Sequence, residues 1–293
     1  MEVTAAPRVA VRTDDRAHLV VALAGGDSNR PLAVLQHGFP DTPATWRHLA
    51  PLLVAAGYRV AMPWLRGYGP SLQGSAWTTI QRYAADLIAV REHLGGDERS
   101  VLVGHDWGAA AAWDAATHAP WRAVVGIAVP PEPALHGLLT DRDQLWRSRY
   151  QFQAQLPVAG WLLREDLRPL VELWLRWSPA YVPTAADLEP LRQALSSRAA
   201  VAAALAPYRA HAVAGLLGRV PSAHGPVPQQ PAMLVHGTED ACIDRRYAVA
   251  ARHVLGAAHP RSTVWLAEGG GHFVHLEQPE LVGDAILSFL DRA

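Results

Sequence analysis

The stretch Gly104-His105-Asp106-Trp107-Gly108 carries the strongest structural signal in this sequence. It lies between an apolar run at 101–103, which predicts a buried strand, and an Ala-rich run at 108–118, which predicts a helix. Small residues around a central polar residue are typical of a nucleophile elbow, a tight turn that raises the central side chain above the carboxyl end of the strand. Asp106 is therefore the candidate nucleophile. The alternative is that Asp106 only caps the following helix.

A carboxylate at the centre of this turn restricts the chemistry. If it attacked an acyl ester it would form an anhydride, which is a poor route to hydrolysis. At a saturated carbon it forms an alkyl ester that water can cleave, whereas a serine there would form a dead-end ether. Asp106 therefore favours cleavage of a carbon–oxygen or carbon–halogen bond at saturated carbon.

The candidate base lies in Gly269-Gly270-Gly271-His272-Phe273-Val274-His275, near the end of the chain. This glycine-rich segment follows an expected strand at 263–266, so it can bring an imidazole over the elbow. We expect His272 to activate the water that cleaves the ester on Asp106. His275 is the neighbouring alternative, and its ordinary interpretation is structural.

The candidate acid follows the expected strand at 233–235, in His236-Gly237-Thr238-Glu239-Asp240. Asp240 matches the chain order nucleophile, acid, histidine. Glu132, after the expected strand at 123–129, is the alternative acid from a different strand end.

An oxyanion hole is expected from His37-Gly38-Phe39-Pro40, which follows the expected strand at 32–35. We assign its two donors to the backbone N–H groups of Phe39 and Trp107, which would stabilise the tetrahedral intermediate formed when water attacks the ester. The plainer interpretation is that these four residues form only a strand-to-helix turn.

Outward from these motifs, short apolar runs alternate with helical ones, and this rhythm predicts an α/β fold with a mostly parallel sheet flanked by helices. From 131 to 221 the pattern is only helical, so we expect a core at 1–130 and 222–293 interrupted by a helical cap at 131–221. Asp41 is the expected N-cap, and Gly57 the expected end, of a helix between the first two strands. The remaining expected elements are a strand at 58–62 and helices at 80–94 and 279–290.

The composition excludes several classes of protein. The net charge is −1 and the 26 basic residues, all arginine, are spread along the chain, so no nucleic-acid partner is expected. One cysteine, Cys242, excludes a disulfide framework and is expected to be a small buried filler. No metal-binding set, signal peptide or transmembrane run is visible. We expect a cytoplasmic protein without cofactor, metal or membrane partner; a homodimer is one assembly that the sequence allows.

At this point the sequence resembles the epoxide hydrolases of the α/β-hydrolase superfamily. The resemblance covers nearly the whole chain, through HGFP at 37–40, RGYGPS at 66–71, GHDWG at 104–108, GTED at 237–240 and GHFVHLEQPE at 271–280. It implies an α/β-hydrolase fold with a cap, and hydrolysis of an epoxide to a vicinal diol through an alkyl ester on Asp106.

The same resemblance implies that two cap tyrosines bind the epoxide oxygen. Tyr150, with Pro157 seven residues later, is similar to the family's first tyrosine segment, and Tyr208-Arg209 is similar to the second. Each could instead be an amphipathic residue that packs its ring and wets its hydroxyl.

Aromatic residues predict an apolar pocket between core and cap, suited to a small hydrophobic epoxide and a water molecule. The residues expected to line it are His37, Phe39, Trp107, Trp146 and Phe273, with Trp161, Trp174 and Trp177 as further cap aromatics.

Two other functions stay open. Haloalkane dehalogenases also carry Trp after the Asp, but many have Asn where Phe39 stands, and fluoroacetate dehalogenases share HGFP but have Arg after the nucleophile. We find no His-Trp halide pair in the cap. The chain could also be a non-catalytic binding protein, because a fold does not fix a function.

Overall fold

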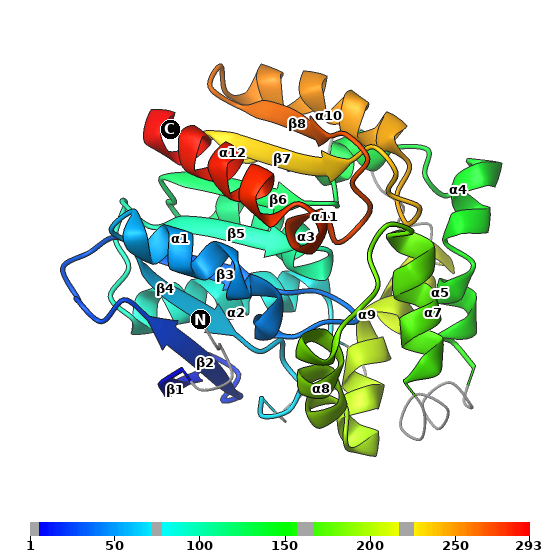
Figure 1. Ribbon diagram of the computed structural model, residues 1–293, viewed down its shortest axis with the longest axis horizontal. Helices are drawn as coiled ribbons and strands as arrows, with labels where there is room; N and C mark the ends of the chain where they lie inside the picture. The colour runs from blue at the N-terminus through cyan, green and yellow to red at the C-terminus, as the bar shows by residue number, and fades with distance from the viewer. Residues whose placement is uncertain (1–5, 72–77, 157–166, 217–225) are drawn as a thin grey trace.

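A computed structural model describes residues 6–71, 78–156, 167–216 and 226–293, with side chains omitted at 214–216 (Figure 1). Eight strands form one sheet in the order β1-β2-β4-β3-β5-β6-β7-β8, parallel from β4 to β8. The strands are β1 (Arg8–Arg12), β2 (His18–Ala24), β3 (Leu32–Gln36), β4 (Arg59–Pro63), β5 (Val101–His105), β6 (Ala123–Ile127), β7 (Ala232–Gly237) and β8 (Thr263–Ala267).

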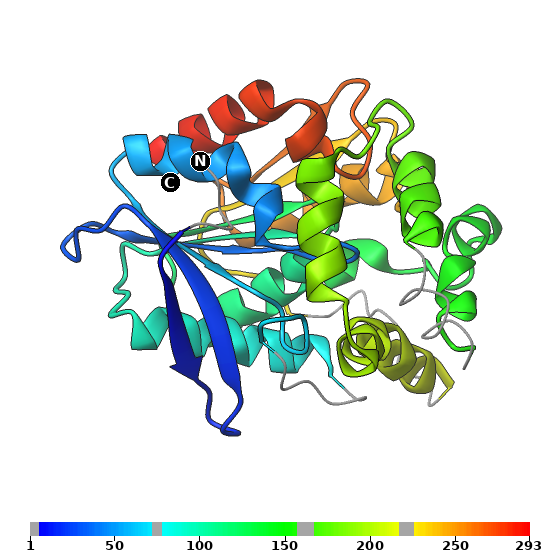
Figure 2. The same cartoon turned by 60° about the horizontal axis from the view of Figure 1, so that its bottom comes forward.

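Helices cover both faces of the sheet, as predicted. Figure 2 shows α1 (Leu49–Ala55) and α12 (Pro279–Arg292) on one face, and α2 (Ile80–His93) and α3 (Trp107–His118) on the other. The first pair packs closely, since a Cβ added at Gly283 would lie 2.4 Å from the side chain of Leu52. The core helices are completed by α10 (Arg245–Ala258) and the short α11 (Val274–Glu277).

The central strands β3, β5, β6 and β7 are buried along their whole length. This is the burial that continuous apolar runs predict for a parallel sheet covered on both faces. The fold class and the six expected strands are confirmed, whereas the antiparallel pair β1 and β2 was not predicted. Its alternating burial follows from its position at the edge of the sheet.

The helix start assigned to Asp41 was wrong. Thr42 caps the 3₁₀ helix η2 (Pro43–Arg47), because its side chain accepts a hydrogen bond from the Ala44 N–H at 3.3 Å. Asp41 instead accepts from the Thr42 N–H at 2.7 Å. The expected end of the helix holds, since Gly57 has φ +91°, a conformation that favours glycine.

Between β6 and β7 the described residues form helices and connecting turns but no strand. These helices lie beside the carboxyl ends of the parallel strands (Figure 1). The cap limits at 131 and 221 stay predictions, and the second limit lies outside the described residues. The inserted helices are η3 (Glu132–Leu135), α4 (Arg142–Arg147), α5 (Tyr150–Gln153), α7 (Arg168–Trp177), α8 (Ala185–Ala194) and α9 (Arg198–Leu216).

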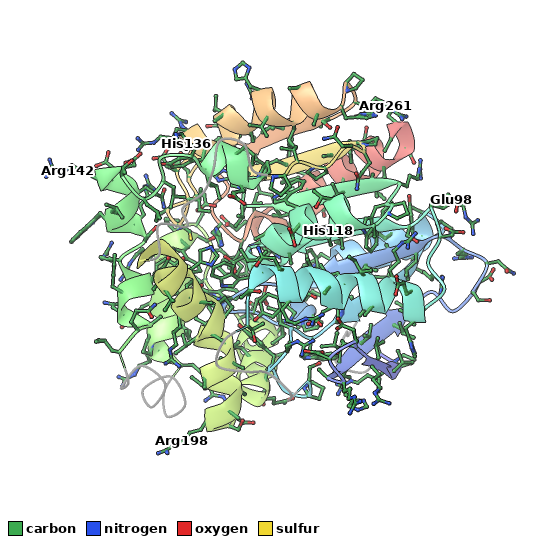
Figure 3. All side chains as sticks on the ribbon, turned by 180° about the vertical axis from the view of Figure 1, so that it is seen from behind. Glu98, His118, His136, Arg142, Arg198 and Arg261 are labelled. Carbon is green, nitrogen blue, oxygen red and sulfur yellow. The ribbon has the colours of Figure 1, made fainter. Side chains whose placement is uncertain are left out.

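Charged side chains lie around the periphery of the molecule. Figure 3 shows Arg142 and Arg198 on the inserted helices and Glu98 and Arg261 at the other end.

Within the described part of the chain, no helix has the length and apolar character needed to cross a lipid bilayer.

Candidate active site

The elbow is a strained turn between β5 and α3. Asp106 has φ 53° and ψ −120°, and its side chain makes no capping hydrogen bond, which contradicts the alternative role of a helix cap. A Cβ at Gly104 would lie 2.1 Å from the Gly108 carbonyl oxygen, and a Cβ at Gly108 would lie 2.1 Å from that of Gln36. The small residues are therefore required by the close approach of three backbone segments.

The loop after β3 binds one carboxylate oxygen of the elbow. The Phe39 N–H donates to Asp106 Oδ1 at 2.8 Å, and a Cβ at Gly38 would lie 2.4 Å from the Asp106 Cβ. Trp107 is the first residue of α3, so its N–H has no partner within the helix. The Phe39 N–H thus binds the Asp106 carboxylate, and the Trp107 N–H follows Asp106 at the start of α3, where it stays the second predicted donor.

His37 holds the loop after β3 through hydrogen bonds to the backbone. Its Nε2 accepts from the Leu65 N–H at 3.0 Å, and its Nδ1 then donates to the Gly38 carbonyl at 2.9 Å. Burial lowers the pKa of His37 to about 3, so the ring is neutral. Since both nitrogens bind backbone, His37 holds the loop; its expected place in the pocket wall does not agree with these contacts.

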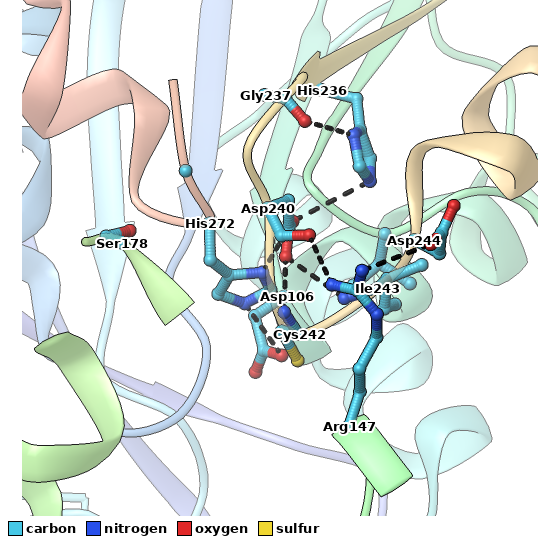
Figure 4. Close-up of polar contacts among 12 residues, drawn as sticks. Asp106, Arg147, Ser178, His236, Gly237, Asp240, Cys242, Ile243, Asp244 and His272 are labelled. Atoms are coloured by element: carbon cyan, nitrogen blue, oxygen red, sulfur yellow. Dashed lines mark hydrogen bonds and ion pairs between the residues drawn. The ribbon is translucent and has the colours of Figure 1, made fainter. Parts of the chain in front are cut away.

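His272 lies between two carboxylates (Figure 4). Its Nδ1 is 2.9 Å from Asp240 Oδ2, and its Nε2 is 3.5 Å from Asp106 Oδ2. Burial lowers the pKa of His272, but the charges and hydrogen bonds of Asp240 and Asp106 outweigh it and raise the pKa to about 10. The structure therefore brings the three predicted residues into contact, with Asp106 Oδ1 on the Phe39 N–H and Oδ2 facing His272.

The alternative acid and base lie elsewhere. Glu132 is exposed in η3, whereas Asp240 is buried against the imidazole. His275 Nε2 bonds to the hydroxyl of Thr45, and burial lowers the pKa of His275 well below its usual value.

Asp240 is held as an anion by its own turn. Its Oδ1 accepts from the backbone N–H groups of Cys242 at 2.7 Å and Ile243 at 3.0 Å (Figure 4). Burial raises the pKa of Asp240, but the charge and hydrogen bond of His272, the charge of His236 and the Ile243 N–H outweigh it and lower the pKa. The Asp240 carboxylate can therefore orient the imidazole and stabilise its charged form.

The two cap tyrosines meet beside the elbow. The Tyr150 and Tyr208 rings are perpendicular, with centroids 5.5 Å apart, and the side chains are buried. The Tyr208 ring also lies 5.2 Å from that of Phe39 and 5.0 Å from that of Trp107. Burial raises the pKa of both hydroxyls far above 10, so both remain hydrogen-bond donors.

The two hydroxyls differ in their partners. Tyr208 Oη has no hydrogen-bond partner among the described residues, whereas Tyr150 Oη lies 3.6 Å from Cys242 Sγ. Pro157, which supported the assignment of Tyr150, lies outside the described residues.

The prediction that Trp146 lines the pocket was wrong. Trp146 is 69% exposed on α4, where the Arg149 guanidinium covers its ring at 4.3 Å. The segment at 268–273, which carries His272 between β8 and α11, is called the base loop. Phe273 is buried and stacked on Trp174 with centroids 3.9 Å apart, so it supports the base loop more than it lines an open pocket. Trp161 lies outside the described residues.

The end of α7 is hydrogen-bonded to the base loop. The sequence did not suggest this contact. The Trp177 carbonyl accepts from the His272 N–H at 3.0 Å, and Ser178 Oγ accepts from the Phe273 N–H at 2.9 Å. No local pattern marks this anchor, because it joins residues about 95 positions apart.

One buried group among the described residues offers metal ligands: Asp41, His105 and His275, with ligand atoms within 4.8 Å of one another. The closest approach of His105 Nδ1 to Asp41 Oδ2 is 3.9 Å. Tetrahedral zinc with bonds of about 2.0–2.1 Å needs separations of about 3.3 Å. The group as it stands is too wide for such an ion.

The chain belongs to the α/β hydrolase fold family, whose pattern matches residues 31–279. It is 30% identical over 276 residues to the AB hydrolase superfamily protein YfhM of Bacillus subtilis, covering 91% of this chain and 92% of that protein.

Named epoxide hydrolases are among the similar proteins. Epoxide hydrolase A of Mycobacterium tuberculosis is 41% identical over 128 residues, a stretch covering 43% of this chain and only 39% of that protein's length. The crystal structure of Epoxide Hydrolase A from Mycobacterium thermoresistibile matches with a TM-score of 0.75 and 27% identity, over 97% of this chain and 98% of that one.

Proposed function

We propose that this protein hydrolyses an apolar epoxide to a vicinal diol through a covalent ester on Asp106. The observation that carries the proposal is a carboxylate at the strained elbow, Asp106, together with two buried tyrosines, Tyr150 and Tyr208, whose rings meet beside it. The aromatic rings of Phe39 and Trp107 border the same point, which favours an apolar substrate. The similarity to named epoxide hydrolases supports the same activity.

In the first step the two tyrosines donate hydrogen bonds to the epoxide oxygen. Asp106 Oδ2 attacks a ring carbon, the carbon–oxygen bond breaks, and the released oxygen takes a proton from a tyrosine. Oδ1 becomes the ester carbonyl oxygen, already bound by the Phe39 N–H.

In the second step His272, oriented by Asp240, takes a proton from a water that attacks the Asp106 carbonyl carbon. The intermediate collapses by breaking the bond between its carbon and Oδ2, and Oδ2 leaves as a hydroxyl oxygen of the diol after taking the proton back from His272. The new carboxylic acid on Asp106 holds the water oxygen and gives the second water proton to His272, which restores the carboxylate and the protonated imidazole. One water is consumed for each diol.

Formation of the ester prepares His272 for this second role. In the free enzyme the Asp106 charge is one of the causes that raise the pKa of His272 to about 10. The ester is neutral, so this contribution disappears, and the protonated imidazole gives its proton through solvent to the tyrosine that lost one in the first step. His272 is then a neutral base. The same residue thus changes protonation between the two half-reactions without an added cofactor.

A single comparison tests the proposal. The purified protein is assayed for diol formation from styrene oxide and for halide release from a haloalkane. Diol without halide supports epoxide hydrolysis. Halide without diol supports dehalogenation, the second candidate, which is favoured by the buried Trp107 Nε1 because it has no hydrogen-bond partner among the described residues. Binding of either compound without turnover supports the non-catalytic alternative.

The tyrosine hydroxyls are expected to matter for epoxides alone. Tyr150→Phe and Tyr208→Phe should each reduce epoxide opening by about 10²-fold, because the leaving oxygen loses a proton donor. Single-turnover ester formation measures this step. Tyr58→Phe, a core tyrosine bonded to Arg122, is the control. Unchanged ester formation in the double variant would refute the role of the tyrosines.

The raised pKa of His272 predicts a pH-dependent stability. A folded-state pKa of about 10 against the usual 6.5 stabilises the fold fully below pH 6.5, and this contribution is lost as the pH rises through 10. The difference in Tm between wild type and His272→Gln should therefore be largest below pH 6.5 and shrink toward pH 10. A difference that grows with pH would contradict a protonated His272.

A further inference from the structure

The inserted helix α4 contacts the loop that carries Asp240 through one of its faces. Asp141 is the N-cap of α4, Gln144 and Arg147 lie on it, and Tyr150 begins α5. Each of the four contacts the segment from Asp240 to Tyr247, which runs from the turn after β7 into the first turn of α10. This segment is called the acid loop below.

Gln144 is the most buried of the four residues, with 1% of its surface exposed. Its Nε2 donates to the Cys242 carbonyl at 2.8 Å and to Ser148 Oγ at 3.0 Å, and its Oε1 accepts from the Asp244 N–H at 3.0 Å. The carboxamide therefore binds the C=O and N–H of alternate residues, as a neighbouring peptide group would.

Gln144 binds the same turn that supplies the donors to the catalytic acid. Cys242 and Ile243 give their N–H groups to Asp240 Oδ1, while Oδ2 is left for His272. The Cys242 carbonyl belongs to the same peptide group as the Ile243 N–H, so the bond from Gln144 fixes this donor directly, and the Cys242 N–H belongs to the peptide group just before it. Gln144 acts on Asp240 through this turn and touches no reacting atom.

Arg147 and Asp141 make further contacts with the acid loop at the exposed edge of α4. Arg147 Nη1 donates to the Asp240 carbonyl at 3.1 Å, and Arg147 Nη2 lies 3.2 Å from Asp244 Oδ2. Asp141 accepts from the Tyr247 hydroxyl at 3.1 Å. These contacts are partly exposed, so they add less than the buried carboxamide.

We propose that Gln144 is a positioning residue that couples the inserted helices to the Asp240–His272 pair. The inference rests on the proposed function. It predicts an effect on the half-reaction that uses His272 as a base, ester hydrolysis, and a smaller effect on ester formation, which uses Asp106 and the tyrosines.

Gln144→Leu removes both bonds to the acid loop and leaves a buried carbonyl and N–H without partners. We expect ester hydrolysis to slow by about 10- to 100-fold, as for a small misplacement of a catalytic group. Single-turnover mass spectrometry measures formation and decay of the ester separately. Gln193→Leu, at an exposed glutamine of α8, is the matched control.

Gln144→Glu keeps the shape and provides a readout that general destabilisation would not give. A protonated glutamic acid can donate to the Cys242 carbonyl and accept from the Asp244 N–H, whereas an ionised one cannot donate. The ratio of variant to wild-type ester hydrolysis should therefore approach one at acid pH and fall as the pH rises. The low-field proton NMR signal of His272 Nδ1–H should shift in the same way.

Three results would overturn the proposal: ester decay in Gln144→Leu equal to that in Gln193→Leu, an equal fall in both half-reactions, or a Gln144→Glu ratio that does not change with pH. If Gln144→Leu fails to fold, Gln144→Glu and the NMR signal still decide. Absence of any ester in the wild type would instead refute the proposed function, while the NMR signal would still test the contact.

Discussion

Asp106→Asn is expected to reduce diol formation by about 10⁴-fold or more, which is the scale of loss when a nucleophile is removed from a coupled catalytic set. The amide keeps an oxygen for the Phe39 N–H but lacks the anionic Oδ2 that attacks carbon. Asparagine tolerates a positive φ, so the elbow should still form. Diol production measured by chromatography is the readout.

Two controls make this result specific. The Tm of Asp106→Asn should stay close to that of the wild type, and Asp291→Asn, at an exposed carboxylate near the end of α12, should leave turnover unchanged. Full activity in Asp106→Asn would show that Asp106 is not the nucleophile.

His272→Gln is expected to trap the ester. Asp106 can still open the epoxide, since the two tyrosines remain, but no base activates water. Epoxide should be consumed once per protein molecule and then stop. The mass of the protein should rise by the mass of the substrate, on the peptide that contains Asp106.

The matched control is His253→Gln, at an exposed histidine of α10, which should turn over normally. Steady turnover in His272→Gln would assign the base elsewhere, with His275 the first residue to examine. Loss of both epoxide consumption and mass increase would mean that His272 is needed before the ester forms.

The elbow, the base loop and the strand pattern could be predicted because each is encoded locally. Gly104 and Gly108 lie within two residues of Asp106 in the sequence, so the elbow pattern is visible there even though the Gly108 contact is with the distant Gln36. The order of Asp106, Asp240 and His272 follows from the order of the parallel strands. A short apolar run is consistent with a buried central strand when turn residues bound it, as they do in this sequence.

The residues that hold the catalytic groups in place could not be predicted, because they make contacts between segments that are distant in the sequence. Gln144 meets Cys242 across 98 residues, and Ser178 meets Phe273 across 95. Trp146 was misplaced because its residue type suits a pocket wall, whereas the direction it faces depends on how α4 docks on the acid loop.

One measurement tests the covalent mechanism most directly: a single turnover of epoxide in ¹⁸O-water with enzyme in excess. Water attacks the carbonyl carbon of the ester, so the label should enter the carboxyl group of Asp106, and the first diol should contain only the oxygen of unlabelled Asp106 and of the epoxide. Label in that first diol, with none in the peptide containing Asp106, would contradict the account, because it would mean that water attacks the epoxide itself.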